Sequence, residues 1–521
     1  MKVVIAEKIA NAALKLFSAP QYEVTGPDEF ARDPAAALEN ADALIVRSAV
    51  QADEKLIANA KQLKVIGRAG VGVDNVDVEF ATRRGIVVMN APGASSVAVA
   101  ELTLALMLAM ARHLSRADQT TRAGQWEKKT LQGTELRGKT LGIVGMGRIG
   151  TEVAIRAVGF EMKVVAADPY LSPARAHELG VQLVSLDELY SIAAYISLHL
   201  ALTPQTKGML NCSAFEKMKD GVRIVNCARG ELINEHDLEQ ALRSGKVGGA
   251  ALDVFSEEPP KGLALLALPN VIATPHIGAS TKEAQEAVGI QIAQQIRDYF
   301  RDGIAQNAVN LQSLTDVEYQ QLRPYIDLAA RVGKFIAQLF CSNLQQIQVE
   351  YEGDLGSWKT KLIGSSLVAS VLQLGSDEPM NMINAQAMAD ARGILVREVH
   401  SARRGAPNAI RATLSGVNGQ VEARATLVHD NEPRLIELDG IDIEAQLEGR
   451  FIAISNDDSP GVVGRIGTIL GEAGVNIARM SLGRNHAGAL AIVQVDGDAP
   501  AELLAKLRKS PSIRTATLLE I

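Results

Sequence analysis

The sequence is poor in cysteine. Only Cys212, Cys227 and Cys341 occur among 521 residues, and they are odd in number and far apart. Such a set provides neither a disulfide framework nor the ligand spacing of a zinc site. The cysteine content therefore argues against a small disulfide-stabilised secreted domain. It predicts a cytoplasmic protein without a metal site.

The sequence also lacks an excess of positive charge and a long hydrophobic run. Its formal net charge is −7, which gives no reason to expect a nucleic-acid partner. The most apolar segment, residues 97–111, contains Glu101 and is shorter than the roughly 20 residues that cross a bilayer. The first residues, "MKVVIAEKIA", are too short an apolar run for a signal peptide. We therefore expect no membrane partner and no export.

The apolar content is sufficient for several cores. Hydrophobic residues make up 47% of the chain, and a typical domain of about 150 residues suggests three or four domains. In the first part, the strand-like segments "KVVIA", "ALIVRS", "KVIGRAG" and "IVVMNAP" alternate with helical patterns at 8–17 and 53–60. This alternation predicts a parallel sheet. The following segment, "SSVAVAELTLALMLAMARHL", predicts a buried helix that packs between two domains.

A second strand-helix series begins at "KTLGIVGMGRIG" and ends at "NVIATPHIGAS". A helical pattern over 281–300 would return the chain to the first unit. We therefore expect residues 1–90 and 283–305 to form one domain, with a second domain inserted at 91–282. A family resemblance carried by the motifs of this region implies that the first is a substrate-binding domain and the second a nucleotide-binding domain. Both would be Rossmann-like, doubly wound parallel-sheet domains.

The last 216 residues suggest two further units. Residues 306–448 combine a helical pattern at 322–339 with the strand-like segments "IQVEYEG" and "ATLVHD", which indicates an α+β intervening domain. Residues 449–521 follow a strand-helix-strand-strand-helix-strand order, as in the ferredoxin-like fold.

A glycine motif predicts the dinucleotide site. Gly145, Gly147 and Gly150 form G-x-G-x-x-G between a strand and a helix, where absent side chains allow pyrophosphate to approach the helix N-terminus. Asp168 ends the next strand, at the spacing of a carboxylate that binds an adenosine ribose. Because an acid there repels a 2′-phosphate, the pattern favours NAD over NADP.

Three residues after later strands are candidates for catalysis. Arg229 follows "VRIVNCA" and could hold a substrate carboxylate and carbonyl by two parallel hydrogen bonds. His276, in "TPHIGAS", could exchange a proton with an alcohol, and Glu258, in "DVFSEEPP", could orient and stabilise its imidazole. Taken singly, each residue could equally be a surface charge or a structural group.

Together, "RAGVGVDN", "GIVGMGRIG", "NCARGELI", "LDVFSEEPP" and "TPHIGAS" resemble the motifs of the D-isomer-specific 2-hydroxyacid dehydrogenases. The resemblance covers residues 1–305 and implies that Arg229, Glu258 and His276 are catalytic. It implies a dimer through the nucleotide domains, in a homo-oligomer expected to be a tetramer. It also implies an NAD site that comprises Gly145, Gly147, Arg148, Ile149, Gly150, Asp168, Cys227, Ala228, Arg229, Asp253, His276, Gly278 and Ala279.

Within this family the chain is most similar to members that oxidise 3-phospho-D-glycerate in the first step of L-serine biosynthesis. The small anionic substrate would contact Arg229 and His276 from one side. In the first domain, the substrate would contact Arg47 and Arg68 at strand ends, and Val71 and Gly72 in the loop "RAGVG". Val71 stands where the family often has a residue with a hydroxyl group. The loop therefore has only main-chain N–H groups to donate to the substrate or cofactor. The segment "HLALTP" after His199 also departs from the family's usual pattern.

The C-terminal segment "ISNDDSPGVVGRIGTILGEAGVNIARM" resembles an ACT domain, a regulatory module that often binds amino acids. Asn456, Asp458 and Asn476 are candidates for holding such an effector, and serine is the effector implied by the resemblance. Asp458 stands where serine-binding members tend to carry Asn, so an ACT domain that only joins subunits stays an alternative. Residues 306–448 resemble the intervening domain of the longer family members, which would respond to anions.

Two other functions are compatible with these sequence features. Glyoxylate or hydroxypyruvate reductases carry the same catalytic residues, although the long C-terminal part argues against them. A non-catalytic sensor of NADH and an amino acid would need the nucleotide site but no catalytic set. The presence of Arg229, Glu258 and His276 together favours an enzyme.

Overall fold

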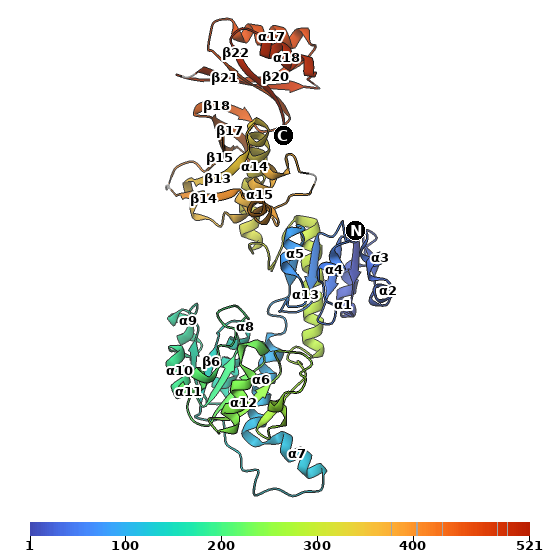
Figure 1. Cartoon of the computed structure of the whole chain (residues 1–521), viewed down its shortest axis with the longest axis vertical. Helices are drawn as coiled ribbons and strands as arrows, with labels where there is room; N and C mark the ends of the chain where they lie inside the picture. Colours follow the sequence, from blue (N-terminus) through green and yellow to red (C-terminus); the bar gives the residue numbers. More distant parts are fainter. Residues whose placement is uncertain (377, 403–404, 430, 487, 498) are drawn as a thin grey trace.

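The computed structural model describes residues 1–376, 378–402, 405–429, 431–486, 488–497 and 499–521. The chain forms four sheets, numbered in chain order. Along the elongated molecule, the unit of the first sheet lies between the units of the second and third, and the fourth lies at one end (Figure 1). Two sheets are parallel, the third is mixed and the fourth is antiparallel, which confirms the predicted fold class.

The first sheet has the order β2-β1-β3-β4-β5 and is parallel throughout. Its strands are Val- and Ile-rich because helices bury both faces. The strands are β1 (Lys2–Ile5), β2 (Glu23–Thr25), β3 (Ala43–Val46), β4 (Val65–Arg68) and β5 (Val87–Asn90), and the helices are α1 (Asn11–Leu14), α2 (Pro27–Arg32), α3 (Pro34–Leu38), α4 (Glu54–Ile57) and α5 (Val78–Arg83).

The second sheet has the order β12-β11-β10-β9-β6-β7-β8 and is also parallel. Its strand order reverses between β6 and β9, so a ligand crevice is expected at their carboxyl ends. The strands are β6 (Thr140–Val144), β7 (Lys163–Ala167), β8 (Gln182–Leu183), β9 (Tyr195–Leu198), β10 (Val222–Asn226), β11 (Val247–Leu252) and β12 (Val271–Ala273), and the helices are α8 (Arg148–Gly159), α9 (Pro173–Glu178), α10 (Leu186–Ile192), α11 (Cys212–Lys217) and α12 (Glu235–Arg243).

Two helices connect these parallel sheets. Helix α6 (Ser96–Arg112) leads into the second sheet, and ten of its residues are buried, as its nearly continuous apolar sequence predicts. Helix α13 (Lys282–Asp302) returns the chain and packs Val288, Ile292 and Ile296 into the core of the first sheet. Gly67 on β4 allows this approach, because a Cβ there would lie 2.7 Å from Ile296.

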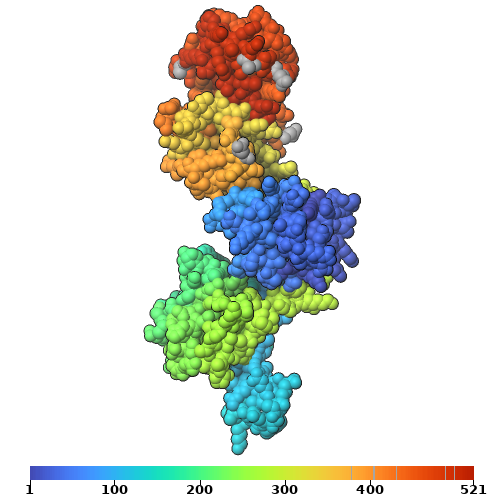
Figure 2. All heavy atoms as spheres, turned by 45° about the vertical axis from the view of Figure 1, so that its right-hand side comes forward, coloured from blue at the N-terminus to red at the C-terminus, as the bar shows by residue number. Residues whose placement is uncertain are grey.

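Helix α7 (Leu114–Arg122) and the loop after it project from the second sheet's unit (Figures 1 and 2). No residue of α7 is buried, and Leu114 and Trp126 are largely exposed. Among the described residues, no single helix is long and apolar enough to span a membrane. The bent pair α6 and α7, at 63° to each other, meets the length and composition criteria together.

The third sheet has the order β14-β13-β15-β16-β17-β18 and is antiparallel except for the pair β13–β14. Helices α14 and α15 form its core with the inward-facing residues of the strands. The elements are α14 (Asp316–Leu339), β13 (Leu344–Glu352), α15 (Lys361–Gln373), α16 (Ala385–Ala391), β14 (Leu395–Ser401), β15 (Ala409–Gly416), β16 (Gly419–Val428), β17 (Glu432–Leu438) and β18 (Ile441–Gln446).

The central strand β19 (Arg450–Asn456) of the fourth sheet is buried on both faces. Along β19, Phe451 and Ala453 join the core of the third sheet, whereas Ile452 and Ile454 pack under α17 and α18. This alternation explains why "RFIAISN" is apolar nearly throughout. The remaining elements are α17 (Val462–Glu472), β20 (Asn476–Asn485), β21 (Gly488–Asp496), α18 (Ala501–Lys509) and β22 (Ile513–Glu520), in the sheet order β20-β21-β19-β22.

Candidate active site

The predicted catalytic residues lie at the carboxyl ends of three neighbouring strands. Arg229 follows β10, Glu258 follows β11 and His276 follows β12, and these strands are adjacent in the second sheet. Because parallel strands end at one edge of the sheet, residues distant in the chain share this edge.

The Arg229 loop is held by a buried amide. Asn226, at the end of β10, is 1% exposed. Its Nδ2 donates to the Arg229 carbonyl (2.8 Å), and its Oδ1 accepts from the Ala228 N–H (3.0 Å). Both ends of the amide are therefore used to fix the backbone from which the Arg229 guanidinium extends.

His276 and Glu258 form a close pair. The Nδ1 of His276 lies 2.7 Å from Oε2 of Glu258, and Oε1 of Glu258 accepts from the Phe255 N–H (3.1 Å). An ionised carboxylate only accepts hydrogen bonds, so Nδ1 carries the proton and Nε2 is left to accept one. The exposed fractions of the two side chains are 50% and 38%, so both are partly accessible to solvent. We call the space between the strand ends after β10 and β4, which the Arg229–Asp74 ion pair crosses, the cleft.

Asp253 determines the shape of the turn that carries His276. Its carboxylate accepts three hydrogen bonds, from Thr274 Oγ1 (2.5 Å), Ile277 N–H (2.8 Å) and Gly278 N–H (2.8 Å). Its backbone carbonyl accepts from the His276 N–H (2.9 Å), and His276 has a φ of +51°. Asp253 is only 1% exposed, and its hydrogen bonds hold the turn that carries His276; its place in the NAD site stays a prediction.

Arginines from both parallel sheets gather across the cleft. Arg68 ends β4, and its pKa is lowered first by burial and then by the charge of Arg229. Arg47 follows β3 and donates to the Lys8 carbonyl (3.0 Å) and to Gln285 on α13. Arg229 forms an ion pair with Asp74 (2.9 Å), which follows β4. The cleft therefore offers positive charge from both sides to a small anion.

The glycine loop fits a dinucleotide. A Cβ on Gly145 would lie 2.5 Å from the His199 carbonyl, and one on Gly150 would lie 2.1 Å from the Gly145 carbonyl, so both close approaches require glycine. Nothing lies within 4 Å of the Cβ position of Gly147, the residue before α8. The open space at this helix N-terminus suits a pyrophosphate.

Three other predicted NAD residues, Arg148, Ile149 and Asp168, lie in or beside this loop. Oδ2 of Asp168 accepts from the Met146 N–H (2.7 Å), which places the carboxylate beside the glycine loop. The Arg148 side chain lies close to Gly93, and Ile149 packs against the core, which leaves its main chain for the cofactor. Cys227 is buried, and burial raises the pKa of its thiol to about 12.

His199, at the end of β9, is a structural part of this site. Its Nε2 lies 2.8 Å from Ser197 Oγ, and its buried Nδ1 has no hydrogen-bond partner among the described residues. Burial lowers its pKa to about 4, so the ring is neutral at pH 7. Its carbonyl contacts Gly145, so the end of β9 shapes the glycine loop.

The two C-terminal units each contain a pocket. One, of about 230 Å³, is lined by Asn456, Asp458, Val462, Leu482 and Arg484, among others. Asn476 lies outside it, at the opposite end of β20, where its Nδ2 donates to Asp496 (2.7 Å). The structure therefore brings together two of the three predicted effector residues.

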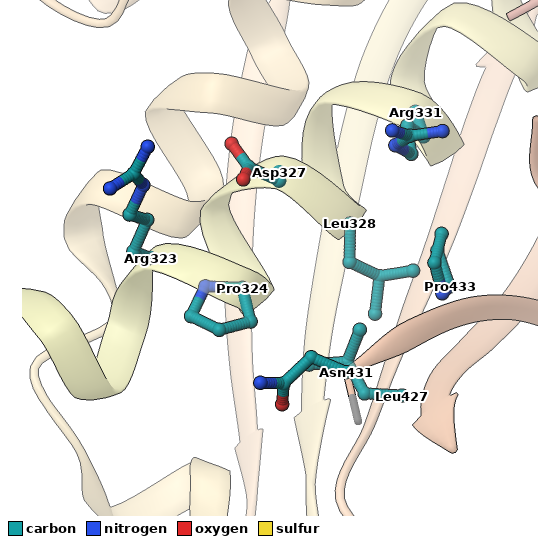
Figure 3. A pocket seen from close by; sticks show the side chains of 8 residues that line it. All are labelled: Arg323, Pro324, Asp327, Leu328, Arg331, Leu427, Asn431 and Pro433. Atoms are coloured by element: carbon teal, nitrogen blue, oxygen red, sulfur yellow. The ribbon is translucent and has the colours of Figure 1, made fainter. Parts of the chain in front are cut away.

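The second pocket, of about 210 Å³, lies between α14 and the β16–β17 hairpin (Figure 3). Arg323, Asp327 and Arg331 lie along the α14 side, and Arg331 donates to the Leu447 carbonyl (2.7 Å). Among the described residues, no group of three or more His, Cys, Asp or Glu side chains could hold a metal ion.

Two residues of the site were not predicted from the sequence. Asp74 and Asn226 lie within the motifs "RAGVGVDN" and "NCARGELI", but nothing in the sequence indicates that they contact or position Arg229. The only signal that could have identified them is a polar side chain at the end of a buried strand, for Asn226, or in the loop that follows one, for Asp74.

Family models match three parts of the chain. The NAD-binding domain of the D-isomer specific 2-hydroxyacid dehydrogenases matches residues 104–278, the D-3-phosphoglycerate dehydrogenase intervening domain matches 321–439, and the ACT domain matches 450–511. The first match confirms the prediction of an NAD-binding domain.

Relatives match over the whole length. D-3-phosphoglycerate dehydrogenase of Bacillus subtilis is 37% identical and covers 100% of this chain and 99% of its own, and that of Methanocaldococcus jannaschii is 40% identical over 93% of both. The crystal structure of Aquifex aeolicus D-lactate dehydrogenase with NAD and lactic acid is 28% identical, with a TM-score of 0.53, and covers 60% of this chain and 100% of its own. The chain belongs to the D-isomer specific 2-hydroxyacid dehydrogenases and, among them, to the D-3-phosphoglycerate dehydrogenase family.

Proposed function

We propose that this enzyme oxidises 3-phospho-D-glycerate to 3-phosphohydroxypyruvate with NAD, the first step of L-serine biosynthesis. The observation that carries the proposal is the position of Arg229 and the Glu258–His276 pair at one strand edge, facing Arg68 and Asp74 across the cleft. The names of the full-length relatives support the same substrate.

The arginines bind the substrate, and the Glu258–His276 pair transfers the proton. Arg229 holds the carboxylate of the substrate, and Arg68 and Arg47 attract its phosphate. Nε2 of His276 accepts the hydroxyl proton, and Glu258 stabilises the imidazolium that results. The glycine loop and Asp168 would hold NAD, which would supply the hydride acceptor for C2 of the substrate.

The loop after β4 completes the substrate site. Val71 and Gly72 offer main-chain N–H groups, and a Cβ on Gly72 would lie 1.7 Å from Arg229 Nη2. We propose that Cys227, Ala228, Gly278 and Ala279 surround the nicotinamide end, since they adjoin Arg229 and His276 in the chain.

Comparison of phosphorylated and unphosphorylated substrates tests this function. NADH oxidation followed by absorbance should show a higher kcat/KM for phosphohydroxypyruvate than for hydroxypyruvate or glyoxylate. Arg68→Gln should reduce this preference. Faster turnover of hydroxypyruvate or glyoxylate would instead identify a reductase of those acids, and NADH binding without turnover of any 2-oxo acid would identify a sensor.

We also propose that the chain forms a dimer through its nucleotide domains, within a tetramer. The arm (residues 114–133) supports this, because α7 buries no residue and Trp126 is 83% exposed on a projecting segment (Figure 2). Such exposed apolar groups are typical of subunit contacts. Light scattering of the wild type and of Trp126→Glu should show a smaller assembly for the variant, whereas an unchanged mass would reject this contact.

We propose that the units act as four domains: residues 1–90 with 283–305, 91–282, 306–448 and 449–521. The last would bind an amino-acid effector, with serine the first candidate, in the pocket that Asn456 and Asp458 line. The pocket beside Arg323 and Arg331 is the candidate site for an anion in the intervening domain. A rate unchanged at millimolar serine would reject feedback by serine.

We place the enzyme in the cytoplasm, where its three cysteines would stay reduced. All three are free in the structure. Cell fractionation with an antibody against the chain tests this location.

A further inference from the structure

The arginine that should hold the substrate carboxylate already holds a carboxylate of the protein. Nη2 and Nε of Arg229 lie 2.9 and 3.1 Å from the same atom, Oδ2 of Asp74. Asp74 follows β4 of the first sheet, and Arg229 follows β10 of the second, so this ion pair crosses the cleft. The Nε–Nη2 edge is one of the two edges by which a guanidinium binds a carboxylate through parallel hydrogen bonds.

Asp74 occupies the guanidinium edge to which the proposed function assigns the substrate carboxylate. A Cβ on Gly72 would lie 2.5 Å from Asp74 Oδ2 and 1.7 Å from Arg229 Nη2. Oδ2 is therefore held between Arg229 and the backbone of the loop after β4. Under the proposed function, Arg229 holds the substrate carboxylate and this loop completes the substrate site.

The Asp74 side chain can leave this position without disturbing the fold. Its exposed fraction is 63%, so it can rotate into solvent. The backbone beside it is fixed, because Asn75 is buried and its Nδ2 donates to the carbonyls of Arg47 (2.9 Å) and Val50 (2.6 Å). The loop can therefore keep its shape while only the carboxylate moves.

The charges of the cleft require a counter-ion when no substrate is bound. Arg68 and Arg229 are close enough for their charges to repel, and burial of Arg68 strengthens this effect. Asp74 offsets both charges, and a substrate carboxylate would offset them equally well. Exchange of one carboxylate for the other keeps a negative charge beside Arg68 and Arg229 throughout the reaction cycle.

We propose that Asp74 is a resident carboxylate that the substrate displaces from Arg229 and that returns to Arg229 when the product leaves. Asp74 thereby lowers the affinity of the cleft for carboxylates and favours product release. This role rests on the proposed function, because it assigns the substrate carboxylate to Arg229. The competing role is that Asp74 stays bound and orients Arg229 for the substrate.

The variant Asp74→Asn separates these roles. We expect it to lower the KM for 3-phosphoglycerate about three- to tenfold, since it removes a competitor with the strength of a partly exposed ion pair. It should also tighten the binding of oxamate, an unreactive analogue of a 2-oxo acid, to the enzyme–NADH complex by a similar factor. NADH fluorescence reports this binding without turnover.

Two further variants are measured in parallel. Glu79→Gln removes an exposed acid that pairs with Arg83 (2.7 Å) on α5 of the same sheet's unit, and it should change neither constant more than twofold. Asp74→Glu keeps the charge, so its oxamate affinity should stay nearer to the wild type than that of Asp74→Asn. Melting temperatures establish that each variant is folded.

A higher KM or weaker oxamate binding in Asp74→Asn would overturn the proposal and identify Asp74 as a residue that orients Arg229. Unchanged constants would overturn it too. If the wild type fails to oxidise 3-phosphoglycerate, the proposed function fails, and oxamate binding still decides the role of Asp74.

Discussion

The substitution Asp253→Asn tests whether a buried carboxylate positions the catalytic histidine. The Asp253 carboxylate accepts three hydrogen bonds, from Thr274, Ile277 and Gly278, and is 1% exposed. An asparagine would turn its NH₂ group toward at least one backbone N–H, so it would lose an acceptor and create a contact between two donors.

The structure sets the expected size of this effect. A hydrogen bond to a charged group contributes about 1.5–3 kcal/mol, and an unpaired buried donor adds to the loss, so we expect the free energy of unfolding to fall by about 2–4 kcal/mol. Since a 1 Å displacement of a catalytic group can cost about 100-fold in rate, kcat should fall by one to two orders of magnitude.

Urea unfolding and the steady-state rate of NADH oxidation measure both effects. The control is Asp220→Asn, which removes an exposed acid paired with Lys246 (2.7 Å) in the same unit and should leave both quantities close to the wild type. Wild-type stability and kcat in Asp253→Asn would refute the reasoning. A loss of NADH affinity with normal kcat would instead support the prediction that Asp253 contacts the cofactor.

Three further predictions concern titratable groups of the same unit. Burial lowers the pKa of His199 to about 4, below the value of about 6.5 expected in the unfolded chain, so its contribution to stability is complete above pH 6.5 and is lost as the pH falls toward 4. Relative to His199→Gln, the wild type should therefore lose up to about 3 kcal/mol between these pH values in urea unfolding, and parallel pH dependences would contradict this. Burial raises the pKa of Cys227 to about 12, so iodoacetamide at pH 8 should label the two exposed cysteines and spare Cys227 in mass spectra of the native enzyme; rapid labelling of Cys227 would contradict its burial. Finally, Glu258→Gln keeps a hydrogen bond to His276 but removes the charge, and because both side chains are partly exposed we expect kcat to fall about 5- to 10-fold, with full activity as the contradicting result.

Much of the fold could be predicted because its strands are apolar on both faces. Segments such as "GIVGMGRIG" contain the strand, the glycine turn and the start of the helix in consecutive residues. The local sequence was therefore sufficient to predict these elements. The third sheet was harder to predict, since several of its strands alternate polar and apolar residues over short stretches and pair antiparallel. Only two of its six strands were recognised from their sequence patterns.

The candidate site was predictable where a residue type and its place after a strand coincide, as for Arg229 and His276. Contacts made across the cleft could not be predicted. Asp74 and Arg229 are 155 residues apart, and only the packing of two sheets brings them together. Asn476 shows the converse: its sequence position resembled an effector contact, but the length of β20 separates it from Asn456 and Asp458.

The rate of His276→Ala with phosphohydroxypyruvate and NADH tests the central claim most directly. General acid–base catalysis contributes about 10²- to 10⁴-fold, so the variant should lose turnover by at least this factor while its NADH dissociation constant stays close to the wild type. Turnover within a few-fold of the wild type would contradict the role of the histidine and, with it, the mechanism built on the strand edge that it shares with Arg229.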